Sequence, residues 1–188
     1  MGPLSTRFDD ALLFASELHR NQTRKGSGIP YIAHLMSVSS RVLSAGGTEI
    51  QAIAGLLHDA AEDQGGQSTL SMIHKRFGPE VAQIVADCTD SWVEPKPEWR
   101  PRKEAYLAKL PSKPVYSLLV SLADKLDNAE AILNDYRQIG DELWRRFTGA
   151  REGTIWYYRE LSTIFTKALP SPLSRDLDRV VSLFPSPE

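Results

Sequence analysis

Hydrophobic residues recur every three or four positions along most of the chain, the spacing that places them on one face of an α-helix. This pattern predicts a first helix over residues 6–21 and, after a polar loop at 24–30, a second helix that ends at Gly46. A third helix follows from about Thr48 until Gly65 stops it. The first third of the chain is therefore expected to form helices joined by short loops.

The remaining sequence continues the helical pattern with one interruption. A short helix over 68–78 and another to about Asp90 precede the segment 91–102, where three prolines forbid a regular helix and predict a long loop. A long apolar helix then extends from Pro114 to about Gly140. No alternating strand pattern is present, so the predicted fold class is all-α, with about eight to ten helices. Further helical segments are expected at 103–110, around Trp144 and Phe147, from Ile155 to Phe165, and up to Phe184.

Composition narrows the class of protein without indicating an activity. The 188 residues are 41% hydrophobic and 24% charged, which suits one globular domain over 1–188. The net charge of −2 lacks the basic excess of a nucleic-acid binder, and no apolar run approaches the ~20 residues that span a membrane. The N-terminus lacks the regions of a signal peptide. Cys88 stands alone, so we expect it to be a small buried residue in a cytoplasmic protein.

Four ionisable residues crowd the end of the third predicted helix: His58, Asp59, Glu62 and Asp63. Residues three and four apart are neighbours on a helix, so Asp59 would face both Glu62 and Asp63. Three carboxylates so close together repel one another unless a cation or a buried proton compensates. A bound metal ion would supply that compensation.

Two more residues could complete a metal site. His34 lies near the start of the second predicted helix, and Asp124 interrupts the most apolar helix, where an unpaired charge is rarely buried. With His58 and Asp59 they form a mixed set of nitrogen and oxygen ligands, which suits manganese, iron, cobalt or zinc better than magnesium. Water on such a metal becomes a nucleophile at neutral pH.

Each of these residues alone has an ordinary structural interpretation. A single histidine on a helix is more often structural than a ligand, and His19 and His74 keep that interpretation because no further ligand accompanies them. Asp124 alone could be the ion-pair partner of Lys125. The presence of all these residues in one chain is what favours a metal site.

The order His…His-Asp…Asp resembles that of the HD superfamily of metal-dependent phosphohydrolases, and finer motifs narrow the resemblance. The resemblance covers about residues 7–166, and residues 171–188 are expected to form a C-terminal helical extension. The pattern is typical of a stand-alone small alarmone hydrolase, which implies an HD-domain helical bundle around a metal site. Three segments resemble the hydrolase motifs of the RelA/SpoT-homologue proteins: Arg24-Lys25 upstream of Pro30-Tyr31-Ile32-Ala33-His34, the HDxxED motif in 57–63, and the ADKxxN motif in 123–128.

The resemblance implies a role for each matching residue. The four candidate ligands match the family's metal ligands, usually of Mn²⁺. Glu62 and Asp63 match the pair that positions and activates the attacking water, one turn beyond the ligands on the predicted helix. Arg24 and Lys25 match the basic pair beside the nucleotide, since arginine can stack on a base and contact phosphate. Asn128 matches the residue that contacts the ribose.

Three further residues lie near these motifs. Arg102 and Lys103 follow the proline-rich loop and are expected to meet the 5′-diphosphate of the substrate; the alternative is a solvated charged face. Asp127 stands where many relatives carry histidine. That position is not a metal ligand in the family, so the departure changes the local charge and leaves the mechanism intact.

The function that the resemblance implies is metal-dependent hydrolysis of the 3′-pyrophosphate of ppGpp or pppGpp, giving GDP or GTP and pyrophosphate. The same site could act on adenosine alarmones such as ppApp, or on NADPH, because motifs around metal and phosphate do not separate purine bases. A nucleotidase of another HD branch and a non-catalytic alarmone sensor are further alternatives, which the complete motif set disfavours. The expected partner is thus a small nucleotide; the sequence identifies no protein partner and no oligomeric state.

Overall fold

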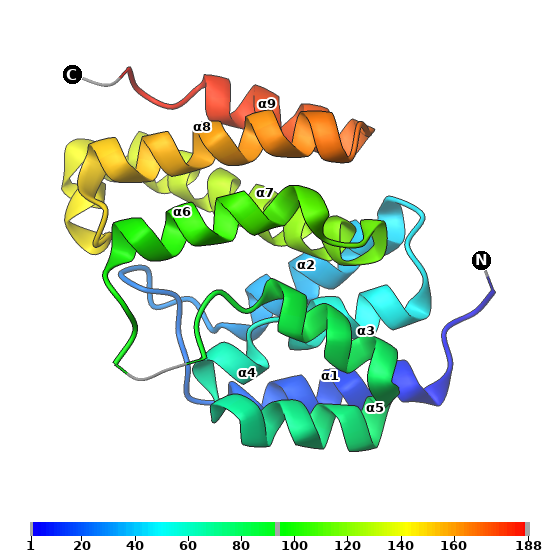
Figure 1. Cartoon of the computed structure of the whole chain (residues 1–188). Helices are drawn as coiled ribbons and strands as arrows, with labels where there is room; N and C mark the ends of the chain where they lie inside the picture. The colour runs from blue at the N-terminus through cyan, green and yellow to red at the C-terminus, as the bar shows by residue number, and fades with distance from the viewer. Residues whose placement is uncertain (1, 93–94, 187–188) are drawn as a thin grey trace.

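The protein is all-α, as the hydrophobic pattern predicts. The structure, a computed structural model, describes residues 2–92 and 95–186, so the last two residues of the predicted extension 171–188 lie outside the described residues. Within the described ranges the backbone forms helices and no β-strand, apart from an isolated bridge between Thr23 and Pro30 (Figure 1). No helix of the described chain is both long and apolar enough to cross a membrane.

The helices follow one another with short connections. Two of them, η1 and η2, are 3₁₀-helices. The bounds are α1 Thr6–Leu18, α2 Ile32–Ser44, α3 Glu49–Leu57, α4 Ala60–Asp63, α5 Gly66–Cys88, α6 Trp99–Lys109, η1 Leu110–Ser112, α7 Val115–Ile139, η2 Gly140–Arg146, α8 Ala150–Ala168 and α9 Pro172–Ser182.

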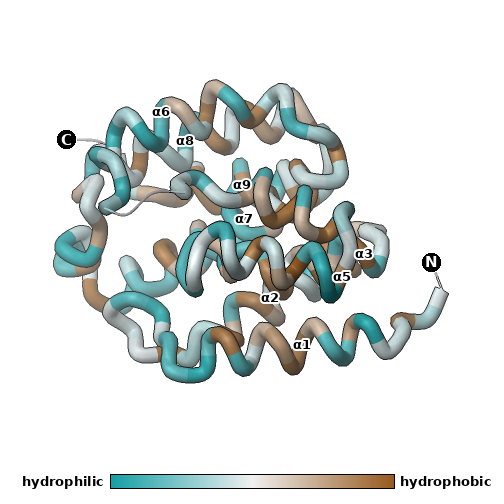
Figure 2. Tube along the Cα trace, turned by 60° about the horizontal axis from the view of Figure 1, so that its bottom comes forward, coloured by the Kyte–Doolittle hydropathy of each residue, from teal (hydrophilic) through white to brown (hydrophobic). Residues whose placement is uncertain are grey.

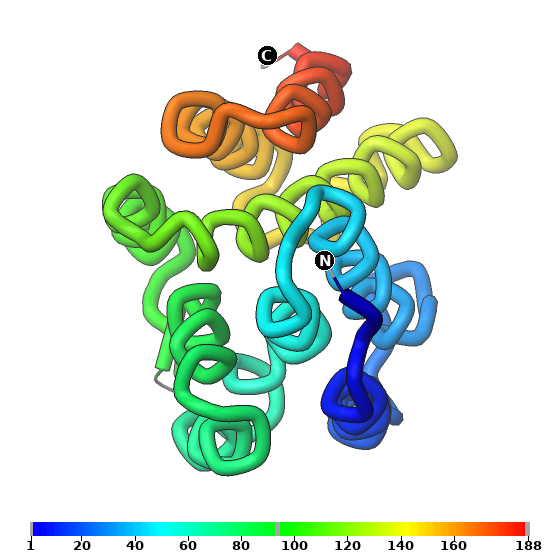
Figure 3. The backbone as a smooth tube through the Cα atoms, turned by 90° about the vertical axis from the view of Figure 1, so that its right-hand side faces the viewer, coloured from blue at the N-terminus to red at the C-terminus, as the bar shows by residue number. Residues whose placement is uncertain are grey.

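Helix α7 is the centre of the molecule. It packs against α2, α3 and α5 on one side and against α8 and α9 on the other. In Figure 3 α7 crosses the middle of the structure, with the N-terminal helices below it and α8 and α9 above. Leu122 and Leu126 on α7 are almost completely buried. The apolar sequence of this helix is therefore explained by contact on nearly every side.

The outer helices are amphipathic, and several of them start at a residue whose side chain caps the helix. Brown and teal positions alternate along α1, as expected for a helix with one buried face (Figure 2). Thr48 and Gln51 form a capping box that starts α3, and Ser171 and Ser174 form another at α9. Cys88 is buried, as predicted.

Three helix boundaries differ from the sequence prediction. The third predicted helix is divided, because α3 ends at Leu57 and a separate single turn, α4, begins at Ala60. Helix α6 begins at Trp99, inside the predicted loop 91–102; Pro101 is tolerated there because the first N–H groups of a helix need no intrahelical acceptor. The segment around Trp144 is the 3₁₀-helix η2.

The predicted boundary between the helices on either side of Gly78 is confirmed. Helix α5 runs through this position, but Gly78 has φ of 88° and ψ of 169°, which is not helical. Glycine adopts such a backbone readily because it has no Cβ, and Pro79 then begins the second straight part of α5.

Candidate metal centre and adjoining pocket

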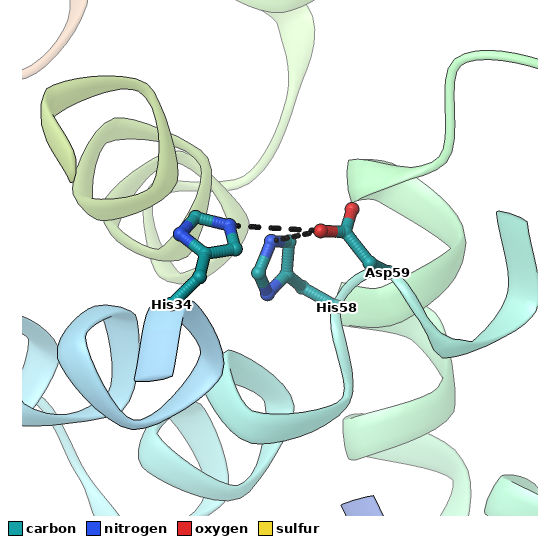
Figure 4. A group of neighbouring side chains, drawn as sticks. All are labelled: His34, His58 and Asp59. Carbon is teal, nitrogen blue, oxygen red and sulfur yellow. Dashed lines mark ion pairs between the residues drawn. The ribbon is translucent and has the colours of Figure 1, made fainter. Parts of the chain in front are cut away.

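The tertiary fold brings two histidines and an aspartate together from distant segments. His34 lies in the first turn of α2, whereas His58 and Asp59 occupy the junction between α3 and α4. Both imidazole rings point toward the Asp59 carboxylate (Figure 4). Each of the three residues offers a ligand atom, and these atoms lie within 4.8 Å of one another, close enough to share one metal ion.

The nitrogen Nε2 is the atom that each histidine directs into this group. His58 Nε2 lies 2.9 Å and His34 Nε2 3.6 Å from Asp59 Oδ2. Asp124, from the middle of α7, faces the same two nitrogens, with its Oδ1 3.4 Å from His34 Nε2 and 3.6 Å from His58 Nε2. The structure thus places the four ligands predicted from sequence around one point.

Hydrogen bonds on the far side of each ring fix which nitrogen is available. His34 Nδ1 donates to Asp127 Oδ2 at 2.7 Å, and His58 Nδ1 donates to the Gly55 carbonyl at 2.8 Å. Both Nε2 atoms are buried and make no hydrogen bond. Buried polar atoms without partners are unusual, and in metal sites it is this second-shell bond at Nδ1 that orients the ligand nitrogen. The donor set therefore fits a divalent transition-metal ion.

Charges within the cluster shift its pKa values strongly. Burial alone would lower the pKa of His34, but the nearby carboxylates of Asp124, Asp127 and Asp59 raise it to about 9. Burial would likewise raise the pKa of Asp124, yet the adjacent Lys125 ammonium and the imidazoles hold it well below its usual range. Without a cation, protons on the histidines offset the carboxylate charges, so a metal would bind in exchange for those protons.

Asp127 has a larger structural role than its place in the sequence motif indicates. Besides accepting from His34, it accepts a short hydrogen bond from the Ser37 hydroxyl. Arg41 Nε lies 3.5 Å and Arg24 Nη1 3.4 Å from its carboxylate oxygens. In the sequence Asp127 is only a departure from the family pattern, because nothing local predicts its contact with a histidine 93 positions away.

Glu62 and Asp63 lie on α4, directly after Asp59. Burial and the charges of Asp90 and Asp59 raise the pKa of Glu62, although Lys96 opposes this shift through a 2.7 Å ion pair. Burial and Asp59 also raise the pKa of Asp63, whose Oδ2 accepts a 2.8 Å hydrogen bond from Gln22. Carboxylates with raised pKa values beside a metal centre are candidates for proton transfer.

Lys96 and Gln22 were not among the residues predicted from the sequence. Both contact the predicted catalytic pair through side chains that come from loops. A position in the proline-rich segment was the only signal available for Lys96.

A pocket of about 200 Å³ opens beside the metal centre. Tyr31 links the two, because its side chain lines the pocket and its hydroxyl donates to Asp59 Oδ2 at 2.6 Å. Asn128 also connects them: it donates to Asp124 and accepts from Arg24 Nη2 at 2.8 Å. The predicted substrate residues Arg24, Lys25 and Asn128 are all part of the lining.

The structure places Arg102 and Lys103 elsewhere. Their side chains pair with Asp90, at 2.5 Å from Arg102 Nη1 and 2.6 Å from Lys103 Nζ, next to Glu62, whose Oε2 accepts from the Asp90 amide. Among the described residues, Arg102 and Lys103 are not part of the pocket lining that contains Arg24. They are mostly buried. The alternative of a solvated charged face is therefore wrong.

An all-α bundle with His and Asp side chains converging from three helical segments defines a class of metal-dependent HD proteins. The HD domain family matches residues 11–155, and the chain belongs to this family. Within it the chain is 37% identical to the human guanosine-3′,5′-bis(diphosphate) 3′-pyrophosphohydrolase MESH1 over 148 residues, which covers 77% of each protein. The mouse protein of the same name is 39% identical over 132 residues, or 68% of this chain and 70% of that one.

Solved structures share the fold. One, described as a metazoan orthologue of SpoT that hydrolyses ppGpp, superposes with a TM-score of 0.78 at 24% identity and covers 97% of both chains. A protein from Listeria monocytogenes gives a TM-score of 0.70 at 27% identity, covering 79% of this chain and 96% of that one. The helical arrangement is therefore the same as in these two solved structures.

Proposed function

We propose that this protein hydrolyses the 3′-pyrophosphate ester of ppGpp and pppGpp. One observation carries the proposal: two buried, unpartnered imidazole nitrogens face Asp59 and Asp124 beside a pocket lined by Arg24 and Asn128. The curated relatives with this activity in their names match between 66% and 77% of the chain, which supports the same reaction here. The adenine-based alternatives have no such support.

We propose that His34, His58, Asp59 and Asp124 hold a divalent metal ion, and that this ion is Mn²⁺. The mixed nitrogen and oxygen donors suit such an ion. When bound, it supplies a Lewis acid that stabilises phosphate charge and lowers the pKa of water. Tyr31 and Asp127 keep two of the ligands in place through hydrogen bonds of 2.6 Å and 2.7 Å.

The remaining groups position the reactants. Glu62 and Asp63 orient the attacking water and accept its proton. Water oxygen then bonds to phosphorus, the bond from phosphorus to the ribose 3′ oxygen breaks, and that oxygen leaves as a hydroxyl after taking a proton. The products are pyrophosphate and GDP or GTP. Arg24 and Lys25 offset the phosphate charge with fixed positive groups, which lowers the barrier, while Asn128 contacts the ribose.

Arg102 and Lys103 are proposed to attract the 5′-diphosphate. Since both already pair with Asp90, the phosphate would share them with this carboxylate. A cytoplasmic location also stays a prediction.

The test is incubation of the metal-stripped protein with ppGpp, with and without Mn²⁺, and separation of the products by anion exchange. Manganese-dependent formation of GDP and pyrophosphate is expected. The variant Asp59→Ala should lose all turnover, whereas Asp10→Ala, an exposed aspartate on α1, should match the parent. No loss of ppGpp in the presence of Mn²⁺, or normal turnover by Asp59→Ala, would refute the proposal.

A further inference from the structure

Two polar residues in the lining of the pocket beside the metal centre lie on the same face of α7. Asn128 and Asp135 both belong to α7 and both line the pocket. Residues seven apart lie on the same face of an α-helix two turns from each other, at about 10 Å along the axis. This span is comparable to the length of a purine nucleoside from the sugar to the far edge of the base.

The chemistry of the lining changes along this span. At the metal end Asn128 contacts Asp124 and Arg24. Ile132 lies between these two residues on α7, and it and Phe147 provide apolar parts of the lining. The far end carries the Asp135 carboxylate. A nucleoside with its ribose at Asn128 would place its base against these apolar parts and its outer edge at Asp135.

The Asp135 carboxylate is held in place by a single cation. Arg146 Nη1 lies 2.8 Å from Asp135 Oδ2, and in the described chain this is the carboxylate's partner, which leaves Oδ1 available to a ligand. Gly26 allows the arrangement, because a Cβ at this position would overlap the Arg146 side chain. The ion pair between Asp135 and Arg146 therefore lies where the loop that carries Arg24 meets the far end of the pocket.

A carboxylate in this position distinguishes purines. An ionised carboxylate only accepts hydrogen bonds. Guanine presents two adjacent donors on its Watson–Crick edge, the N1–H and the N2 amino group, whereas adenine presents an N1 lone pair beside its N6 amino group. We propose that Asp135 is a specificity-determining residue that selects guanine over adenine. The proposal rests on the proposed nucleotide substrate, and it would also disfavour NADPH, whose purine is adenine.

The experiment compares equilibrium binding of GDP, ADP and IDP in the presence of Mn²⁺. GDP should bind about 10- to 100-fold more tightly than ADP, the factor expected when a half-buried charged acceptor keeps or loses its donors. Inosine lacks only the N2 amino group, so IDP should bind more weakly than GDP. Asp135→Asn should reduce the GDP-to-ADP ratio to near one or reverse it. Glu142→Gln, which removes one exposed negative charge outside the pocket, should keep the parent ratio.

Two results would overturn the proposal. One is equal affinity of the parent protein for GDP, ADP and IDP; the other is a GDP-to-ADP ratio that Asp135→Asn leaves unchanged. The IDP comparison needs no substitution and holds even if the variant folds poorly. None of these ligands carries a 3′-pyrophosphate, so their binding decides the role of Asp135 whether or not ppGpp is cleaved.

Discussion

At the scale of single residues, the hydrogen bond between His34 Nδ1 and Asp127 decides which nitrogen of that ring can bind a metal. The carboxylate accepts a hydrogen bond from Nδ1–H, so once the imidazole is neutral its lone pair is on Nε2, which faces Asp59 and Asp124. The His58 ring is oriented in the same way by a backbone carbonyl. Only one of the two imidazoles therefore depends on a side chain that mutation can remove.

Loss of the Asp127 carboxylate should weaken metal binding. We expect Asp127→Ala to lower the Mn²⁺ affinity about 10- to 100-fold, the usual effect of removing an outer-shell partner, and Asp127→Asn to lower it less because its amide oxygen can still accept. Titration of Mn²⁺, with the unbound ion measured by electron paramagnetic resonance, gives the dissociation constants. Glu130→Gln on the same helix is the charge-matched control. An unchanged Mn²⁺ affinity in Asp127→Ala would mean that Asp127 does not support metal binding by His34.

Replacement of Glu62 separates proton transfer from metal binding. Glu62→Gln keeps the size of the side chain, so we expect kcat to fall about 10²- to 10⁴-fold while the Mn²⁺ affinity changes little. Steady-state kinetics with ppGpp and the same Mn²⁺ titration measure the two effects. Glu104→Gln, at an exposed position on α6, provides the control. A normal kcat would assign the proton transfer to Asp63 alone.

At the scale of elements, the contact between the end of α5 and the start of α6 depends on one buried charge cluster. Asp90 follows α5, and Arg102 and Lys103 lie in the first two turns of α6. Burial alone would raise the pKa of Asp90, but Lys103 and Arg102 together lower it to about 2. The cluster therefore holds the start of α6 against the end of α5, where the Asp90 amide donates to Glu62.

This lowered pKa makes the stability of the protein depend on acid pH. A depressed carboxylate pKa contributes stability above the ordinary pKa of 3.8 and loses that contribution as the pH falls toward about 2. Relative to Asp90→Asn, the parent should be about 2 kcal/mol more stable at neutral pH, and the difference should shrink below about pH 4. Urea unfolding at several pH values measures it. A difference that does not change with pH would mean that Asp90 stabilises through packing.

At the scale of the whole molecule, the metal centre joins helices that are far apart in sequence. Its candidate ligands come from α2, from the α3–α4 junction and from α7, the helix against which both halves of the bundle pack. Figure 1 shows these elements meeting in the interior of the fold. An ion bound there would link the N-terminal helices to the central helix.

Metal loading should therefore stabilise the whole fold. An ion that binds only the native state, at a free concentration 100 times its dissociation constant, adds about 2.7 kcal/mol to the free energy of unfolding. This corresponds to a rise of roughly 5–10 °C in Tm for a chain of this size. Thermal unfolding with Mn²⁺, and again after a chelator, measures the shift. Asp59→Ala should show no shift at the same Mn²⁺ concentration; an equal shift would place the stabilising ion elsewhere.

Local physics explains why much of the architecture follows from the sequence. The spacing of apolar residues predicted α2 and α7 close to their true limits and located the middle of α8, and Gly78 predicted the break in α5, because helix periodicity and glycine conformation act over a few residues. The candidate ligands could be named for a similar reason: ionisable residues in apolar helices, such as Asp124, need a partner wherever they fold. The motifs then linked them to one family.

Tertiary structure decided everything that depends on contacts between distant segments. The break between Leu57 and Ala60 turns His58 and Asp59 inward, against the expectation of one continuous helix. Partners such as Asp127 for His34 are set by how α7 packs on α2. These contacts carry no local signature, because any carboxylate can pair with any cation that packing brings near it. The sequence by itself therefore determined the helices and the reactive side chains, whereas packing determined which of them meet.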